Sequence, residues 1–420
     1  MCKNILTFIL LCTMTLLSCS GGGGKGQSSK DIPALLMTVP SDALAVVSAS
    51  RCEDALALYD STSVLHRLSL GRLSRANAVL SICYSGSAVP VLAIRTPYGQ
   101  AADSTSDAFR LMRQAASLKL YAEATEACGG ALVITPSEAQ MQAVRRHLQG
   151  GTSILAAPDF VSALGLRRDA DDFIILKNSG SQRLVPRDVL SKVFNYREMT
   201  SFLKTLSEWT VLSPAGAAAY DIDFYRSEGS EYFANLMDAI PSDGGNLSKV
   251  LPVNAEFVMA MAAGSQEFRD AFRKFKDASV KLTSYEKKLA TLRKDCGKDP
   301  LAWEKETGVR EIALMVIPEG KIFMVKHSKK VADKDVAENP YRGFAEALYG
   351  SAFSCGDDSC TAIFNGWQLF GSENVLQAFI ASEKMGENFK WPKGYRLYLL
   401  SPKGTLEWGK KGIKYEISVT

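Results

Sequence analysis

The sequence predicts an α+β fold made of two tandem copies of one strand–helix–hairpin–strand–helix unit, with mostly antiparallel sheets. Three observations lead to this prediction. Four sequence patterns recur in the same order, 212 to 235 residues apart. Neighbouring strands are separated by short glycine-containing turns, which suit antiparallel pairing. The chain has 420 residues, of which 46% are hydrophobic and 22% charged, so it is long enough for two sizeable cores.

The first recurring pattern is a proline placed just before an apolar run. Val39-Pro40 precedes one such run in TVPSDALAVVSA, and Leu251-Pro252 precedes the other in VLPVNAEFVMAMA. Each run predicts a β-strand, and a helical pattern follows it in both copies.

After that helix, which is the second recurring pattern, the third pattern is a pair of β-rich runs on either side of a tight turn. The first copy has AVLSICYSGSAVPVLAIR with its turn at residues 85–87, and the second has EIALMVIPEGKIFMVKHS with its turn at residues 318–320. Runs of this kind around a glycine predict a β-hairpin in each copy.

The last pattern is a strand that passes directly into a helix. The strand in GGALVITPSEAQ ends at Ser137-Glu138, and the strand in NGWQLFGSENV ends at Ser372-Glu373. A serine at the N-cap with an acid in the first turn satisfies the free amide groups of a helix start. We therefore expect a helix to begin at each serine.

The second copy carries a long helical insertion. From residue 265 a charged helix with one apolar stripe is expected, and a further helix should run from Asp299-Pro300 to Gly308. We expect the stripe to cover the protein's own sheet, although it could dock a partner helix or a membrane. The stripe residues are Phe268, Phe272, Phe275, Leu282, Leu289 and Leu292.

Strand patterns outside the two copies complete the expected organisation. AAAYDIDFY predicts a strand between the copies, and YRLYLLS and IKYEISV predict two strands near the C-terminus. The expected segments are a signal peptide (1–18), a flexible Gly/Ser tether (19–31), the first repeat (32–180), a connecting segment (181–247) and the second repeat (248–420).

The N-terminal segment reads as an export signal. Lys3 is its only charge before Cys19, and residues 5–17 form an apolar stretch of thirteen residues. A membrane-spanning helix needs about 20 apolar residues, so this stretch is too short to span and has the layout of a secretory signal peptide.

Leu16-Leu17-Ser18-Cys19 resembles the bacterial lipobox. The resemblance implies cleavage before Cys19 and fatty acylation, with palmitate-type chains, of its thiol and new amino group. Two or more acyl chains anchor a protein stably on a bilayer. Ser20, where aspartate would signal inner-membrane retention, implies the outer membrane, facing the periplasm or alternatively the cell surface. The alternative is an ordinary signal peptide that is cleaved without lipidation of Cys19.

Six cysteines remain beyond Cys19, an even number that permits disulfides in an oxidising compartment. In SCGDDSC, Cys355 and Cys360 flank a Gly-Asp-Asp turn and could form a disulfide across a hairpin. Two free buried thiols are the alternative. A metal site with Asp357 and Asp358 is disfavoured because no second pair of ligands accompanies it.

Charge and motifs argue against several function classes. The net charge of +4 is too small to indicate nucleic-acid binding. No GxSxG or HExxH motif occurs, and the S-x-x-K at Ser201-Lys204 is a weak pattern in a chain of this length. His66, His147 and His327 lie far apart. We therefore predict no catalytic residues, no metal and no cofactor.

The lipobox and the doubled unit together resemble a family of bacterial envelope lipoproteins that is defined by a domain of unknown function. This resemblance implies a two-copy α+β fold and supplies no activity. We expect a non-enzymatic binding or assembly protein whose partners are the bilayer, through Cys19, and an envelope protein or glycan. An envelope hydrolase with a site assembled from distant residues is one alternative. A solute-capture lipoprotein of a nutrient importer is another, with Trp303, Trp367 and Trp391 as candidate ligand contacts.

Overall fold

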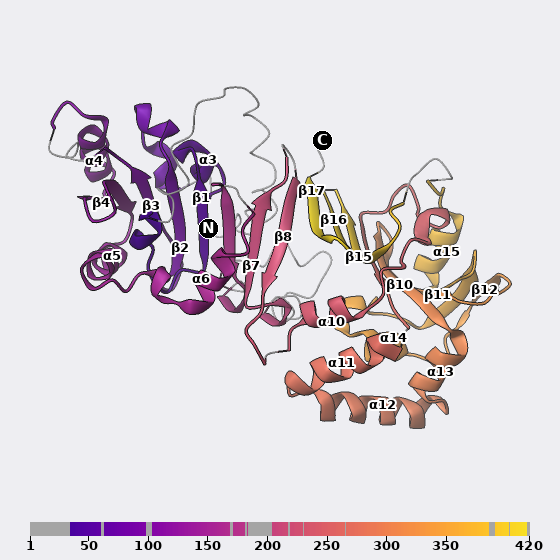
Figure 1. Cartoon of the computed structure of the whole chain (residues 1–420). Helices are drawn as coiled ribbons and strands as arrows, with labels where there is room; N and C mark the ends of the chain where they lie inside the picture. Colours follow the sequence, from indigo (N-terminus) through magenta and orange to yellow (C-terminus); the bar gives the residue numbers. More distant parts are fainter. Residues whose placement is uncertain are drawn as a thin grey trace. The chain divides into compact units, whose positions relative to one another are not determined.

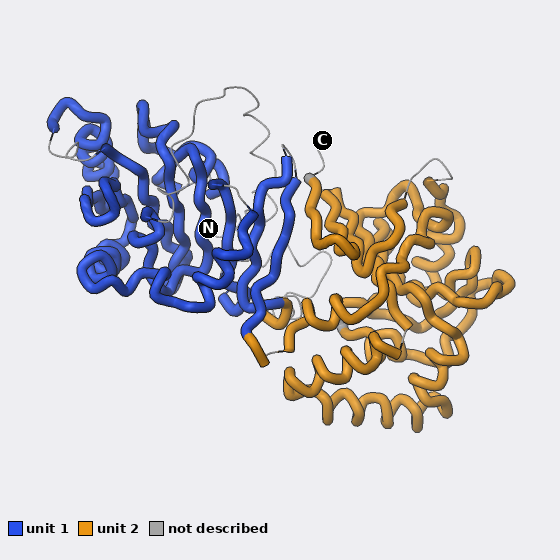
Figure 2. Tube along the Cα trace, in the orientation of Figure 1, with its two compact units in different colours: residues 1–192, 207–227, 419 blue, residues 193–206, 228–418, 420 orange. Residues whose placement is uncertain are grey.

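Two compact units make up the protein (Figure 2). Unit 1 comprises residues 1–192, 207–227 and 419, and unit 2 comprises residues 193–206, 228–418 and 420. The computed structural model describes residues 34–59, 63–97, 103–168, 171–180, 183, 204–216, 219–229, 231–264, 266–385, 391–402 and 404–417. Each unit is described by itself below.

Unit 1 is built on an antiparallel sheet (Figure 1). Across the sheet the strands pair in the order β4-β5-β3-β2-β1-β6-β7-β8. Their bounds are β1 (Ala45–Ala49), β2 (Ala78–Tyr84), β3 (Ala88–Arg95), β4 (Tyr121–Thr125), β5 (Ala131–Thr135), β6 (Phe173–Lys177), β7 (Trp209–Pro214) and β8 (Ala219–Tyr225).

Helices cover both faces of the unit 1 sheet, which explains why its central strands are apolar almost throughout. On one face, a single hydrophobic core contains Val133 of β5 with Met141 and Val144 of α5 (Glu138–Gly150). Farther along the same core, Phe160 of α6 (Pro158–Leu164) contacts the ring of Trp209 of β7. On the other face, Ile134 is also fully buried. That face carries α3 (Cys52–Ala57) and α4 (Asp107–Ser117) together with the 3-10 turns η3 (Val64–Arg67) and η4 (Gly71–Arg75).

Unit 2 is built on a second antiparallel arrangement of strands. Its order is β12-β13-β14-β11-β10-β9-β15-β16-β17. Their bounds are β9 (Phe257–Ala262), β10 (Val309–Ile317), β11 (Gly320–His327), β12 (Lys334–Glu338), β13 (Cys360–Phe364), β14 (Trp367–Gly371), β15 (Tyr395–Ser401), β16 (Gly404–Gly409) and β17 (Gly412–Ile417).

One helix, α15 (Glu373–Ala381), packs on the core that contains Trp367 and Leu369. The remaining helices of unit 2 are α10 (Phe233–Ala239), α11 (Gln266–Ala278), α12 (Leu282–Cys296), α13 (Pro300–Thr307) and α14 (Phe344–Tyr349). Short 3-10 turns complete the described structure of both units: η2 (Leu36–Thr38), η6 (Ile154–Ala156), η7 (Asn178–Gly180), η8 (Leu247–Lys249) and η9 (Ser351–Phe353).

The helical insertion differs from the single striped helix expected from the sequence. It breaks into α11 and α12 around Val280, which has a positive φ of 55° and is 93% exposed. The three phenylalanines of the stripe are buried in α11, whereas α12 has no buried residue. The stripe therefore covers the core only along α11, and α12 packs back on it through the ring contact of Phe272 with Tyr285.

The prediction of a mixed α+β fold with antiparallel sheets is confirmed. Both hairpins lie where the sequence placed them, as β2–β3 and β10–β11. The hairpin β7–β8, in the segment expected to connect the repeats, continues the sheet of unit 1. In the described part of the chain, no helix has the length and apolar character needed to cross a membrane.

Candidate functional site

An arginine-lined pocket in unit 1 is the most chemically distinctive site in the described structure. Its volume is about 680 Å³, and it lies between η4, the end of β3, the start of α4 and the β4–β5 turn. This volume falls in the range typical of small-ligand sites. Its charged lining residues are Arg72, Arg75, Arg95, Arg110, Asp103 and Asp107.

The last residue of β3, Arg95, contributes the half-buried arginine of the pocket. Its guanidinium donates a hydrogen bond of 2.7 Å to the carbonyl oxygen of Cys128 in the β4–β5 turn. The turn can approach this closely because of Gly129 and Gly130, both at positive φ. A Cβ at Gly130 would lie 2.3 Å from the carbonyl oxygen of Thr96, so only glycine fits there.

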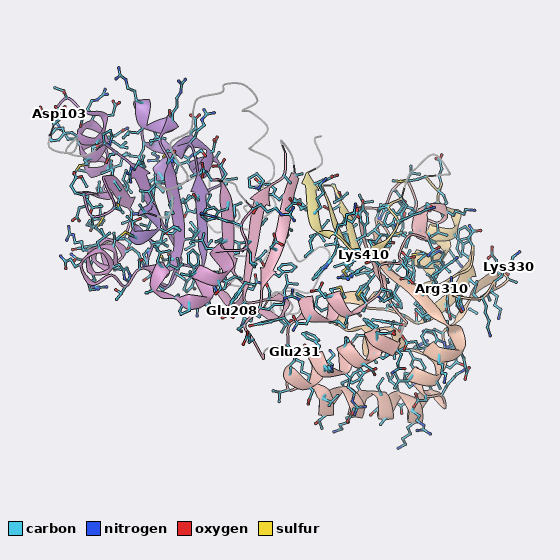
Figure 3. All side chains as sticks on the ribbon, viewed as in Figure 1. Asp103, Glu208, Glu231, Arg310, Lys330 and Lys410 are labelled. Atoms are coloured by element: carbon cyan, nitrogen blue, oxygen red, sulfur yellow. The ribbon has the colours of Figure 1, made fainter. Side chains whose placement is uncertain are left out.

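The start of α4 forms another wall. Ser106 caps the helix by accepting a hydrogen bond of 3.1 Å from the amide of Phe109. Asp107, in the first turn, forms an ion pair with Arg110. Asp103, labelled in Figure 3, accepts hydrogen bonds from the amide and hydroxyl of Thr105, which hold the pKa of its carboxyl below the usual range.

Two arginines of η4 are left available for a ligand. Arg72 and Arg75 are exposed, and neither has an ion-pair partner among the described residues. Four guanidinium groups against two carboxylates make the pocket net positive. Because the planar guanidinium presents paired donors that match carboxylate and phosphate oxygens, the arrangement can hold an anion.

The residues singled out from the sequence lie elsewhere. Cys19 and Ser201 fall outside the described residues. The thiols of Cys355 and Cys360 are free, as are all six cysteines in the described part of the chain. This structure has no disulfide between Cys355 and Cys360, and its formation under oxidising conditions stays a prediction.

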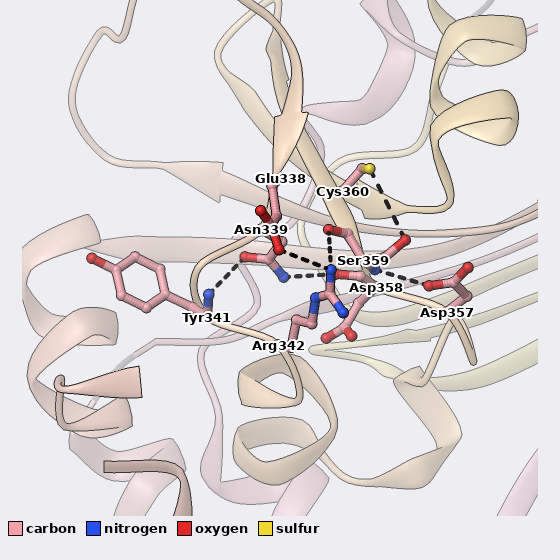
Figure 4. A network of polar contacts seen from close by, with 8 residues as sticks. All are labelled: Glu338, Asn339, Tyr341, Arg342, Asp357, Asp358, Ser359 and Cys360. Atoms are coloured by element: carbon pink, nitrogen blue, oxygen red, sulfur yellow. Dashed lines mark hydrogen bonds and ion pairs between the residues drawn. The ribbon is translucent and has the colours of Figure 1, made fainter. Parts of the chain in front are cut away.

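The turn between these two cysteines is held by hydrogen bonds of its aspartates (Figure 4). Asp357 accepts a hydrogen bond of 2.9 Å from the amide of Ser359. Asp358 accepts one of 2.6 Å from the amide of Gly343, and its carbonyl oxygen accepts one from the side chain of Asn339. These contacts join the turn to β12 and α14. Over the residues that can be described, no three His, Cys, Asp or Glu side chains gather as metal ligands would.

Two of the histidines and the three candidate tryptophans make local or core contacts, whereas His66 is exposed. Nδ1 of His147 contacts the hydroxyl of Thr152 at 3.2 Å, and Nε2 of His327 contacts the side-chain oxygen of Gln368 at 3.2 Å. The tryptophans named as candidate ligand contacts, Trp303, Trp367 and Trp391, are 4%, 1% and 5% exposed, so they do not form an exposed aromatic surface.

No sequence motif marks the pocket, because its arginines come from η4, the end of β3 and α4. The usable signals were local. GRLSR places Arg72 and Arg75 three residues apart, and Arg95 ends a strand ahead of the glycine pair 129–130. No protein-family model, curated protein sequence or solved structure matches this chain.

Proposed function

We propose that this protein is a bacterial envelope lipoprotein that is tethered to the outer membrane through acylated Cys19 and binds an anionic ligand in unit 1. The role is one of binding, without catalysis. The observation that carries the proposal is the convergence of four arginines on one pocket of about 680 Å³. The ligand is an acidic glycan or a phosphate-bearing envelope component, since both present the oxygens that guanidinium groups recognise.

Ligand binding is tested with two anionic probes, trigalacturonic acid and pyrophosphate, and with neutral maltotriose as the control ligand. Calorimetry on the full chain should detect at least one anionic probe and no maltotriose. The double variant Arg72→Ala/Arg75→Ala should lose about tenfold or more in affinity, since hydrogen bonds to charged groups contribute about 1.5–3 kcal/mol each.

The matched control is Arg146→Ala, which removes an exposed arginine on α5 outside the pocket lining. Its affinity should equal that of the parent. Equal binding by the parent and the double variant, or no binding of either anion, would overturn the ligand proposal. Binding by only one anion would identify which oxygen chemistry the pocket selects.

The tether is tested separately. The parent should partition into the detergent phase and carry acyl chains on its N-terminal residue. Cys19→Ala should move to the aqueous phase and keep its precursor mass. Unchanged partitioning and processing of Cys19→Ala would refute lipidation while leaving the ligand proposal intact.

We also propose that the two units are copies of one ancestral unit. β1 pairs with β2 and β6, and β9 pairs with β10 and β15. On its other side, the third strand of each unit pairs with the second strand of the following hairpin. These pairs are β3 with β5 in unit 1 and β11 with β14 in unit 2.

A side-chain contact supports the same correspondence. Arg95 lies in register with Ala131 and donates to a carbonyl in the β4–β5 turn. Lys326 lies in register with Trp367 and donates, at 3.2 Å, to the carbonyl of Asn365 in the β13–β14 turn. A basic residue at the end of the third strand thus holds the following turn in each unit.

A further inference from the structure

Among the described residues of unit 1, no strand pairs with the outer edge of β4, whereas unit 2 covers the corresponding edge of β13 with β12. β4 pairs with β5 on one side, from Tyr121 opposite Thr135 to Thr125 opposite Ala131. No described residue pairs with its other side. In unit 2, β13 pairs with β14 on one side and with the additional strand β12 on the other.

Strand β12 shows what this edge accepts. It is a five-residue strand of sequence KDVAE that pairs antiparallel with β13. Four of its five residues are exposed, and only Val336 is partly buried, against the core beneath α15. The strand therefore attaches by its backbone and inserts one apolar side chain.

Unit 1 has a groove at the corresponding place. A groove of about 240 Å³ lies between β4 and α5 and is floored by buried Val133, Met141 and Val144. Leu148, partly buried, lines it further along α5. Its lining also includes Glu123 and Arg145, which form an ion pair at 2.5 Å, so the groove presents apolar carbon with polar groups at its margin.

We propose that β4 accepts an extended peptide from a partner polypeptide as an added antiparallel strand. The peptide places one apolar side chain in the groove over Val133, Met141 and Val144, with polar residues on either side of it. Backbone hydrogen bonds to an exposed sheet edge supply affinity and the side-chain pocket supplies selectivity. The short length of β4 limits indiscriminate pairing, as natural edge strands require. This surface is distinct from the arginine-lined pocket and does not depend on its ligand.

The test uses the full chain and a fluorescent peptide that copies residues 332–340, ADKDVAENP. Anisotropy should show saturable binding, and amide hydrogen exchange should slow at residues 121–125. A peptide with aspartate in place of its central valine should bind at least about tenfold more weakly, because it loses the buried apolar contact. This comparison leaves the protein unchanged, so it does not depend on how a variant folds.

A protein variant locates the site. Leu148→Asp should weaken peptide binding by a similar factor, whereas Gln142→Asp, on the exposed side of α5, should not. Protection that appears at β13 instead of β4 would overturn the proposal, because the peptide would then have replaced β12. Absence of binding would overturn it too, as would self-association through β4 that the peptide competes away, since the occupant would then be a second copy of the chain.

Discussion

Apart from the additional strand β12 of unit 2, units 1 and 2 pair their strands in the same order, but they place their charged side chains differently. Unit 1 gathers four arginines around an open pocket, and two of them lack ion-pair partners among the described residues. Unit 2 buries two carboxylates, those of Glu304 and Glu311, and each accepts contacts from side chains of the same unit. The difference shows that the strand order supplies a frame, while the connections between strands decide whether a unit is built for binding or for stability.

The clearest buried charge in unit 2 is Arg269 of α11. Its guanidinium forms an ion pair with Glu304 of α13 and donates at 2.6 Å to the carbonyl oxygen of Leu348. The hydroxyl of Tyr349 donates to the same carboxylate at 2.6 Å. The guanidinium also lies 4.8 Å from the ring centroids of Phe268 and Tyr349, so the ion pair is enclosed by aromatic rings.

A second buried carboxylate, Glu311 of β10, strengthens the contrast. It is fully buried and accepts hydrogen bonds from the hydroxyl of Tyr395 and from the amide and side chain of Asn246. Burial raises the pKa of Glu311, and the hydrogen bonds from Tyr395 and Asn246 oppose that rise. The carboxylate joins β10, β15 and the segment before η8, which is a structural role.

The largest effect should come from breaking the buried ion pair. Arg269→Ala leaves Glu304 buried without its partner, so unit 2 should lose about 3–5 kcal/mol of unfolding free energy. Unit 1 should keep its stability. Native-state hydrogen exchange read by mass spectrometry reports the two units separately.

Arg273→Ala is the matched control on the same helix. Arg273 pairs with Glu286, but the two side chains are 67% and 48% exposed, so its loss should cost at most about 1 kcal/mol. Equal costs for the two variants, or a loss of Arg269→Ala that spreads into unit 1, would mean that the burial contrast does not govern stability.

Thiol labelling should separate the units next. Cys52, Cys83 and Cys128 of unit 1 are 0%, 0% and 4% exposed, whereas Cys296 and Cys360 of unit 2 are half-buried. Under native conditions an alkylating reagent should reach only the unit 2 thiols, as read by peptide mapping. Labelling of any unit 1 thiol before global unfolding would show that unit 1 opens locally.

Within unit 2, Cys355 should react slowly despite its partial exposure. Burial, with the nearby Asp358 carboxylate, raises the pKa of the Cys355 thiol to about 12. At pH 8 its thiolate population is then roughly a thousandfold below that of an ordinary thiol, and its labelling rate should rise about tenfold per pH unit. A rate that levels off near pH 9 would contradict this assignment.

The disulfide predicted between Cys355 and Cys360 has its own test. A mass loss of two hydrogens under mild oxidant, mapped to these two cysteines, would support it.

The sequence indicated those parts of the fold that local patterns determine. Apolar, β-branched runs around residues 85–87 and 318–320 predicted the two central hairpins, which are present. It did not indicate β4 and β12. YAEAT and KDVAE are rich in alanine and charge, which favour helix, and they form strands because a neighbouring strand pairs with them.

The arginine-lined pocket could not be predicted for a related reason. Arg72, Arg95 and Arg110 are brought together only when the β1–β2 and β3–β4 connections fold against the end of the sheet. No local spacing records that convergence. A site formed by the connections has to be found in three dimensions, whereas strands and turns leave a periodic signal in the sequence.

The smallest effect concerns a helix N-cap whose Ser-Glu sequence is the same in units 1 and 2. Ser137 and Ser372 each occupy the N-cap position after the fifth strand of the shared pattern. Only Ser137 acts as a cap, accepting a hydrogen bond of 3.3 Å from the amide of Gln140, while the hydroxyl of Ser372 accepts none. Ser137→Ala should therefore cost about 1 kcal/mol in unit 1, and Ser372→Ala only a few tenths in unit 2, by the same exchange measurement. If both substitutions cost about 1 kcal/mol, the caps are equivalent in solution. The contrast between the units would then be confined to their buried charges and their connections. Ser372 would cap α15 in the same way as Ser137 caps α5.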